Sequence, residues 1–229
     1  MEKELRYLEN SEIRANAESR DVEGYALLFN TTSRNLGGFV ERIEPSALDG
    51  VIENSDVMAV LNHDNSRGIL ARSRFGQGSL TLSVDDRGLK YTFSAPKTAL
   101  GDECLEYLRR GDITQSSFAF TVSEDSWAKQ EDGSYVRTIR HFDRLFDVSP
   151  VFEPAYFGTD VKCARYQEVL EEEKAENERK LAELEEQEKQ KREAEEAEKE
   201  AKLKEYYESI REAYKDALKH AEELNEKAG

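Results

Sequence analysis

Three side chains of this sequence could together form a serine nucleophile and its base. His63 stands between Asn62 and Asp64 after an apolar run, and an imidazole titrates near neutral pH, which suits a general base. The run 116–120 supplies a serine hydroxyl, and Asp147 lies between apolar neighbours, where a carboxylate needs a partner. Spacing alone leaves simpler roles open: a turn histidine, a hydrogen-bonded core serine and an edge-strand aspartate.

Other chemistries lack a recognisable pattern. The histidines, His63, His141 and His220, are far apart, and no H-x-x-x-H or C-x-x-C spacing occurs. The sequence has no phosphate loop, dinucleotide fingerprint or Gly-x-Ser-x-Gly elbow. Cys104 and Cys163 give neither a disulfide framework nor a zinc quartet, so we expect two reduced thiols. We therefore expect no metal and no cofactor.

The composition divides the chain in two. Its 229 residues carry 33 basic and 49 acidic side chains, a formal charge of −16. Residues 1–164 hold all four prolines and all ten phenylalanines, whereas residues 165–229 hold 14 basic and 22 acidic residues. Broad nucleic-acid binding needs a basic surface, and a membrane span needs about 20 apolar residues. We therefore expect two domains, with neither nucleic acid nor membrane as a partner.

Residues 1–164 must position the candidate catalytic side chains, and their pattern is mostly that of β-strands. Short apolar or alternating runs are separated by turn signals. The runs are 24–30, 39–43, 57–61, 69–72, 79–84, 89–94, 116–122, 135–139 and 145–149. A helical turn is expected near 46–51, and a helix over 102–110 that ends at Gly111. This mainly β, α+β pattern predicts a closed or nearly closed β-barrel with helices packed outside.

Residues 165–229 predict a helix with little core of its own. Glutamates recur four residues before a basic residue, a spacing that stabilises exposed helices. Near the end, apolar residues alternate in steps of four and three, which is an a/d seam: Leu203, Tyr207, Ile210, Tyr214, Ala217, Ala221 and Leu224. Such a seam favours a coiled coil with another chain, or equally a helix hairpin that folds back on its own chain.

Six short motifs occur in an order that resembles the prohead (capsid maturation) protease family of tailed bacteriophages. The resemblance covers roughly residues 3–164. It rests on Glu23-Gly24-Tyr25-Ala26, Phe39-Val40-Glu41-Arg42-Ile43, Leu61-Asn62-His63-Asp64, Ser117-Phe118-Ala119-Phe120, Arg137-Thr138-Ile139 and Leu145-Phe146-Asp147-Val148-Ser149-Pro150. This family is related to the herpesvirus assembly proteases. The resemblance therefore implies a β-barrel surrounded by helices and a serine endopeptidase.

The resemblance also assigns roles to individual residues. His63 matches the catalytic histidine of the family, and Ser117, directly before Phe-Ala-Phe, matches its nucleophile, with Ser116 as a neighbour. Asp147 matches the third member of the triad, for which His141 and Asp143 are competitors. The sequence departs from the family at Ala119, where glycine is common, at Phe157, where proline is common, and at Asp147, where glutamate is common.

What the resemblance implies for function is specific. Residues 1–164 would be a serine protease domain that cleaves scaffold, or the scaffolding segment of the major capsid protein, and also itself. Residues 165–229 would be an acidic tail that acts as scaffold or carries the enzyme into the prohead. The expected location is the prohead interior in the host bacterial cytoplasm, and the expected partners are the capsid and scaffold proteins, with homo-oligomers through the tail. The alternative is an inactive scaffold protein on a protease-like fold.

Overall fold

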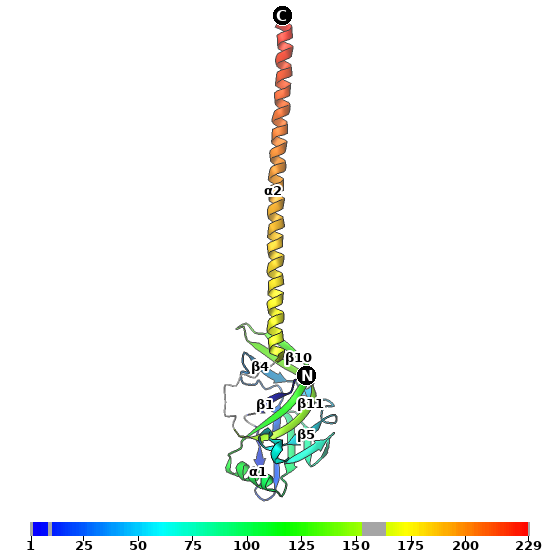
Figure 1. Ribbon diagram of the computed structural model, residues 1–229, viewed down its shortest axis with the longest axis vertical. Helices are drawn as coiled ribbons and strands as arrows, with labels where there is room; N and C mark the ends of the chain where they lie inside the picture. The colour runs from blue at the N-terminus through cyan, green and yellow to red at the C-terminus, as the bar shows by residue number, and fades with distance from the viewer. Residues whose placement is uncertain (1, 9–10, 153–163, 229) are drawn as a thin grey trace. The chain divides into compact units, whose positions relative to one another are not determined.

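The computed structural model describes residues 2–8, 11–152 and 164–228. The chain divides into two units, residues 1–164 and 165–229. The first unit carries all the strands, and the second is helical (Figure 1).

The larger sheet of the first unit has seven strands and is organised around two long ones. β10 (Gln115–Lys129) and β11 (Tyr135–Val151) form an antiparallel pair at its centre. β1 (Glu4–Leu8) pairs antiparallel with the outer side of β10. β4 (Phe39–Ile43) and β5 (Asp56–Ala59) pair in parallel with successive parts of β11, and β6 (Ala71–Arg74) and β7 (Gln77–Gly78) continue beyond β5.

The smaller sheet has four antiparallel strands in the order β2-β3-β9-β8. These strands are β2 (Arg14–Ala15), β3 (Asp21–Leu28), β8 (Leu80–Val84) and β9 (Gly88–Ser94). Alternation along β9 buries Leu89, Tyr91 and Phe93, as expected for a strand with one face on a core. One continuous hydrophobic core contains side chains from both sheets.

The helical elements of the first unit are short. α1 (Ala99–Arg110) buries Leu100, Cys104, Leu105 and Leu108 in the core. It begins at Thr98, whose hydroxyl accepts a hydrogen bond from the Gly101 amide, and it ends at Gly111, whose φ of 77° suits glycine. The 3-10 turns are η1 (Pro45–Leu48), η2 (Leu61–His63) and η3 (Asn65–Arg67).

The expectation of a closed barrel is wrong for the described residues. A barrel closes only when its two edge strands pair with each other. The larger sheet instead runs from β1 at one end to β7 at the other, and the smaller sheet is separate. A second difference is that runs 135–139 and 145–149 belong to one continuous strand, because β11 stays paired with β10 throughout.

The second unit is one helix, α2 (Ala164–Ala228), so the helix hairpin expected as an alternative is absent from residues 164–228. Lys180 and Lys202 form 2.6 Å ion pairs with Glu176 and Glu198, four residues earlier. The first four seam residues are exposed: Leu203, Tyr207, Ile210 and Tyr214. The side chains of Ala217, Ala221, Leu224 and His220 lie outside the described part. No helix among the described residues has a stretch long and apolar enough to span a membrane.

Candidate active site

Three side chains from distant parts of the sequence form one chain of hydrogen bonds. The His63 imidazole lies between the other two: Nε2 is 2.6 Å from Ser117 Oγ, and Nδ1 is 2.6 Å from Asp147 Oδ1. The carboxylate can only accept, so Nδ1 carries the donated proton. This is the relative arrangement of nucleophile, base and orienting acid in serine hydrolases.

The register of β10 and β11 places Ser117 and Asp147. Ser117 is opposite Ser149, and Ala119 is opposite Asp147, so Ser117 and Asp147 are diagonal neighbours on one face of the sheet. Diagonal neighbours on antiparallel strands are about 7–8 Å apart. An imidazole ring fits between two side chains at that separation.

A short turn after β5 brings His63 to the gap. Met58 of β5 is opposite Asp147 in the parallel pairing with β11. Leu61 is buried and anchors the start of the turn, and then Asn62 and His63 both adopt left-handed backbone, with φ of 57° and 59°. This backbone conformation costs each non-glycine residue about 1–3 kcal/mol of conformational free energy. Such strained residues cluster at functional sites, where the backbone must hold a side chain in one orientation. The Asn62 side chain supports the turn by accepting a hydrogen bond from the Phe152 amide, at 3.2 Å.

Asp147 is held in place by further contacts. The Ser149 hydroxyl donates to Asp147 Oδ1 at 2.8 Å, and the Lys3 ammonium lies 3.6 Å from Oδ2. The residue is only 5 % exposed. A buried carboxylate with fixed donors keeps one orientation, so the imidazole that it contacts is also fixed.

Ser117 is completely buried, and its hydroxyl has a second neighbour. The Oγ donates to the main-chain oxygen of Arg6, in β1, at 2.8 Å. A hydroxyl has one proton. It therefore cannot donate to the Arg6 oxygen and to His63 Nε2 at the same time.

The competing candidates lie in other surroundings. Ser116 faces the core, where its hydroxyl is 2.7 Å from that of Tyr91. His141 contacts Ser123 and the Asp49 carbonyl, and Asp143 accepts from Thr121. Phe157 lies outside the described residues.

The remaining groups with metal-binding or nucleophilic chemistry can be described one by one. Cys104 is free and buried, and burial raises the pKa of its thiol to about 12. Such a thiol is a poor nucleophile at neutral pH. Cys163 lies outside the described residues. Across residues 2–8, 11–152 and 164–228, no three His, Cys, Asp or Glu side chains cluster as metal ligands would.

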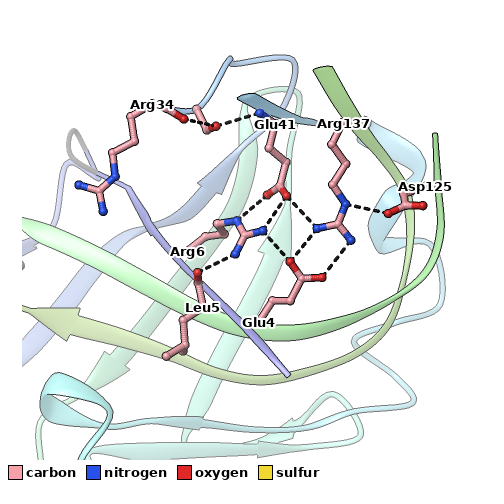
Figure 2. Close-up of polar contacts among 8 residues, drawn as sticks. Glu4, Leu5, Arg6, Arg34, Glu41, Asp125 and Arg137 are labelled. Atoms are coloured by element: carbon pink, nitrogen blue, oxygen red, sulfur yellow. Dashed lines mark hydrogen bonds and ion pairs between the residues drawn. The ribbon is translucent and has the colours of Figure 1, made fainter. Parts of the chain in front are cut away.

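A group of five charged side chains, three of them buried, adjoins the site, and the sequence pattern did not predict it (Figure 2). It consists of Glu4 and Arg6 in β1, Glu41 in β4, Asp125 in β10 and Arg137 in β11. Arg6 forms two hydrogen bonds with Glu41, at 2.9 and 2.8 Å. Arg137 contacts Glu4 at 2.6 and 2.9 Å, Glu41 at 3.0 Å and Asp125 at 2.7 Å. In the sequence, only the alternation of Glu4 and Arg6 with Leu5 and Tyr7 indicates that the two charged side chains share one face. Their partners Glu41 and Arg137 are distant in sequence.

The charges in this group perturb each other. Burial alone would raise the pKa of Glu4, but hydrogen bonds and charges from Arg137 and Arg6 outweigh it, so the pKa lies below its ordinary value. Burial alone would lower the pKa of Arg6, and Glu41 reverses this. The group therefore fixes β1 through ion pairs.

The family model described as caudovirus prohead serine protease matches residues 7–174. Among solved structures, the bacteriophage T4 capsid assembly protease, gp21, is similar, with 12 % sequence identity and a TM-score of 0.39. That similarity covers 67 % of this chain and 100 % of the other. No curated protein sequence matches the chain.

Proposed function

The chain belongs to the caudovirus prohead serine protease family, and on this premise we propose that it is a serine endopeptidase of capsid maturation. Its substrates would be scaffold, or the scaffolding segment of the major capsid protein, and the protease itself. The observation that carries the proposal is the hydrogen-bonded chain from Ser117 through His63 to Asp147.

The mechanism follows from the order of these contacts. His63 Nε2 accepts the proton of Ser117 while Oγ attacks a peptide carbonyl carbon, and the protonated imidazole then gives that proton to the leaving amine. Asp147 holds Nδ1 and stabilises the imidazolium. Backbone amides or an arginine would stabilise the oxyanion. Water then hydrolyses the acyl-enzyme, with His63 again as the base.

The tail is proposed to bring the enzyme to its substrates inside the prohead, within the host bacterial cytoplasm. Four large apolar side chains of its seam are exposed: Leu203, Tyr207, Ile210 and Tyr214. A partner helix, from scaffold or from a second copy, could cover them in a coiled coil. A fold relationship to the herpesvirus assembly proteases stays a prediction from the sequence resemblance.

Co-expression with the capsid protein of the same phage tests the activity. With the wild-type protein, mass spectrometry should detect defined fragments of the capsid protein and of the protease itself. With Ser117→Ala, these fragments should be absent. Ser116→Ala is the matched control, because that hydroxyl faces the core and contacts Tyr91. Unchanged processing by Ser117→Ala would overturn the assignment.

The second candidate is an inactive scaffold protein that works through its tail. The complete burial of Ser117 is the observation that favours it. A chain truncated after Arg165 separates the roles: loss of packaging with retained cleavage assigns targeting to the tail. Packaging equal to full length would exclude a targeting role.

A further inference from the structure

The candidate nucleophile of this site is buried, and the strand β1 lies directly beside it. Ser117 has no exposed surface. β1 pairs with β10 directly across it, with Tyr7 opposite Ser117 and Leu5 opposite Ala119. A substrate carbonyl carbon must come within about 3–3.5 Å of the attacking oxygen. The chain segment at that position is β1.

β1 and the residue before it contact all three members of the triad. The Arg6 carbonyl oxygen accepts from Ser117 Oγ at 2.8 Å. The Tyr7 ring meets His63 edge-on, with centroids 6.2 Å apart. The Lys3 ammonium is 3.6 Å from Asp147 and also lies over the Phe146 ring.

β1 lies where a bound substrate peptide would lie, but the orientation of its Arg6 carbonyl is not that of a peptide bond under attack. The Arg6 oxygen faces the hydroxyl as a hydrogen-bond acceptor, whereas a reacting carbonyl must present its carbon to Oγ and its oxygen to other donors. While Ser117 donates to Arg6, its proton is not available to His63. The arrangement therefore blocks attack and is not itself a cleavage geometry.

We propose that the edge of β10 at Ser117–Ala119 is the binding site for an extended substrate peptide, and that β1 is its intramolecular occupant in the resting protein. The substrate would replace β1 by strand exchange and pair with β10 through its main chain, as in β-strand addition. This inference rests on the proposed protease function and specifies how its substrate binds.

The position of β1 in the sheet allows it to leave. It is the last strand in the described order, so its removal breaks pairing with β10 alone. Leu5 and Tyr7 are 39 % and 37 % exposed. A cavity of about 260 Å³ borders the strand, lined in part by Leu8, Leu27 and Ile43. Apolar packing therefore holds β1 less closely than it holds the central strands.

The charged anchor of β1 is also compatible with release. When β1 leaves, Glu4 and Arg6 enter water and regain their hydration, which offsets much of the lost pairing. Arg137 keeps Glu41 at 3.0 Å and Asp125 at 2.7 Å (Figure 2). Release of β1 thus leaves the buried Arg137 paired with two carboxylates.

A reversible lock on the strand tests the proposal. Leu8→Cys/Ser116→Cys joins directly opposed residues, which lie close enough for a disulfide after small adjustment, and Ser116 lies outside the proposed binding edge. The background is the full chain with Cys104→Ala and Cys163→Ser. Thr81→Cys/Thr92→Cys, an opposed pair on β8 and β9, is the matched control. The readouts are labelling of Ser117 by a fluorescent fluorophosphonate and cleavage of purified capsid protein, with thiol titration to verify the disulfide.

The expected result is loss of labelling and cleavage in the oxidised lock and their return on reduction, with no such change in the control. An oxidised lock that cleaves as fast as its reduced form overturns strand exchange and leaves the protease function intact. Reduced and wild-type proteins that are as inert as Ser117→Ala overturn both.

Hydrogen exchange gives a measurement that needs no disulfide. In the wild-type chain, β1 amides should exchange faster than those of the β10–β11 pair, because β1 opens locally. Equal protection of β1 and β11 would contradict the proposal.

Discussion

Replacing Asp147 with asparagine would remove one negative charge from the site and change little of its shape. The carboxylate accepts from His63 Nδ1 at 2.6 Å and from the Ser149 hydroxyl at 2.8 Å. An amide oxygen can replace one acceptor but cannot balance an imidazolium, and an amide turned the other way presents a donor to Nδ1. The variant should therefore fold and bind but react slowly.

The magnitude follows from the distance between the two charges. The centres of an imidazolium and a carboxylate in this contact are about 4 Å apart, which corresponds to about 4 kcal/mol at an effective dielectric constant near 20. The two side chains are 17 % and 7 % exposed, so water screens the pair little. Because about 1.4 kcal/mol changes a rate tenfold, Asp147→Asn should lower kcat/KM about 1000-fold.

The assay is cleavage of purified capsid protein, with folding checked by thermal unfolding. Asp147→Glu keeps the charge and should retain much more activity than Asp147→Asn. Asp143→Asn is the control, since Asp143 contacts Thr121 and not His63. A kcat/KM for Asp147→Asn within about threefold of wild type, less than 1 kcal/mol, would refute the role assigned to this carboxylate.

Three further predictions concern stability and reactivity. The pKa of Glu4 is held below its ordinary value of 4.5, so its contribution to stability is present above that pH and is lost as the pH falls; Glu4→Gln should flatten the decline in unfolding free energy measured in urea between pH 7 and acid. Cys104, whose pKa is raised to about 12, should resist iodoacetamide at pH 8 in the native chain and react after unfolding, as mass spectrometry would show; native alkylation would contradict its burial. Phe142→Ala should cost about 3–5 kcal/mol of unfolding free energy, because its fully buried ring lies 4.6 Å from that of Phe120; Phe75→Ala, at a residue 63 % exposed, should change it by less than about 0.5 kcal/mol.

Local patterns were sufficient for most strands. The run 39–43 coincides with β4, and runs 79–84 and 89–94 differ from β8 and β9 by one residue. Period-two alternation reports burial of one face, which is a local property. The order of pairing is not local, so the separation into two sheets was not predicted and a barrel was expected instead.

The candidate site shows the same limit. The ordered motifs selected Ser117, His63 and Asp147, because side-chain type and sequence neighbours identify them. They did not reveal β1 over Ser117, since the stretch Glu4–Leu8 shows only alternation. Its partners Glu41 and Arg137 are 35 and 133 residues from the strand residues that they contact. Only the folded register brings them together.

The length and exposure of α2 determine what repeated cleavage would do to it. Its 65 residues, at about 1.5 Å each, extend about 100 Å. The described side chains of its later part, from residue 174 to 215, are all exposed, so hydrogen bonds and neighbouring ion pairs must sustain the helix without a core. Isolated helices shorter than about 12–15 residues are marginal in water. Cleavage at several positions would therefore convert one long helix into short peptides that are mostly unfolded in water. Because these peptides are separate chains, the helix could not form again.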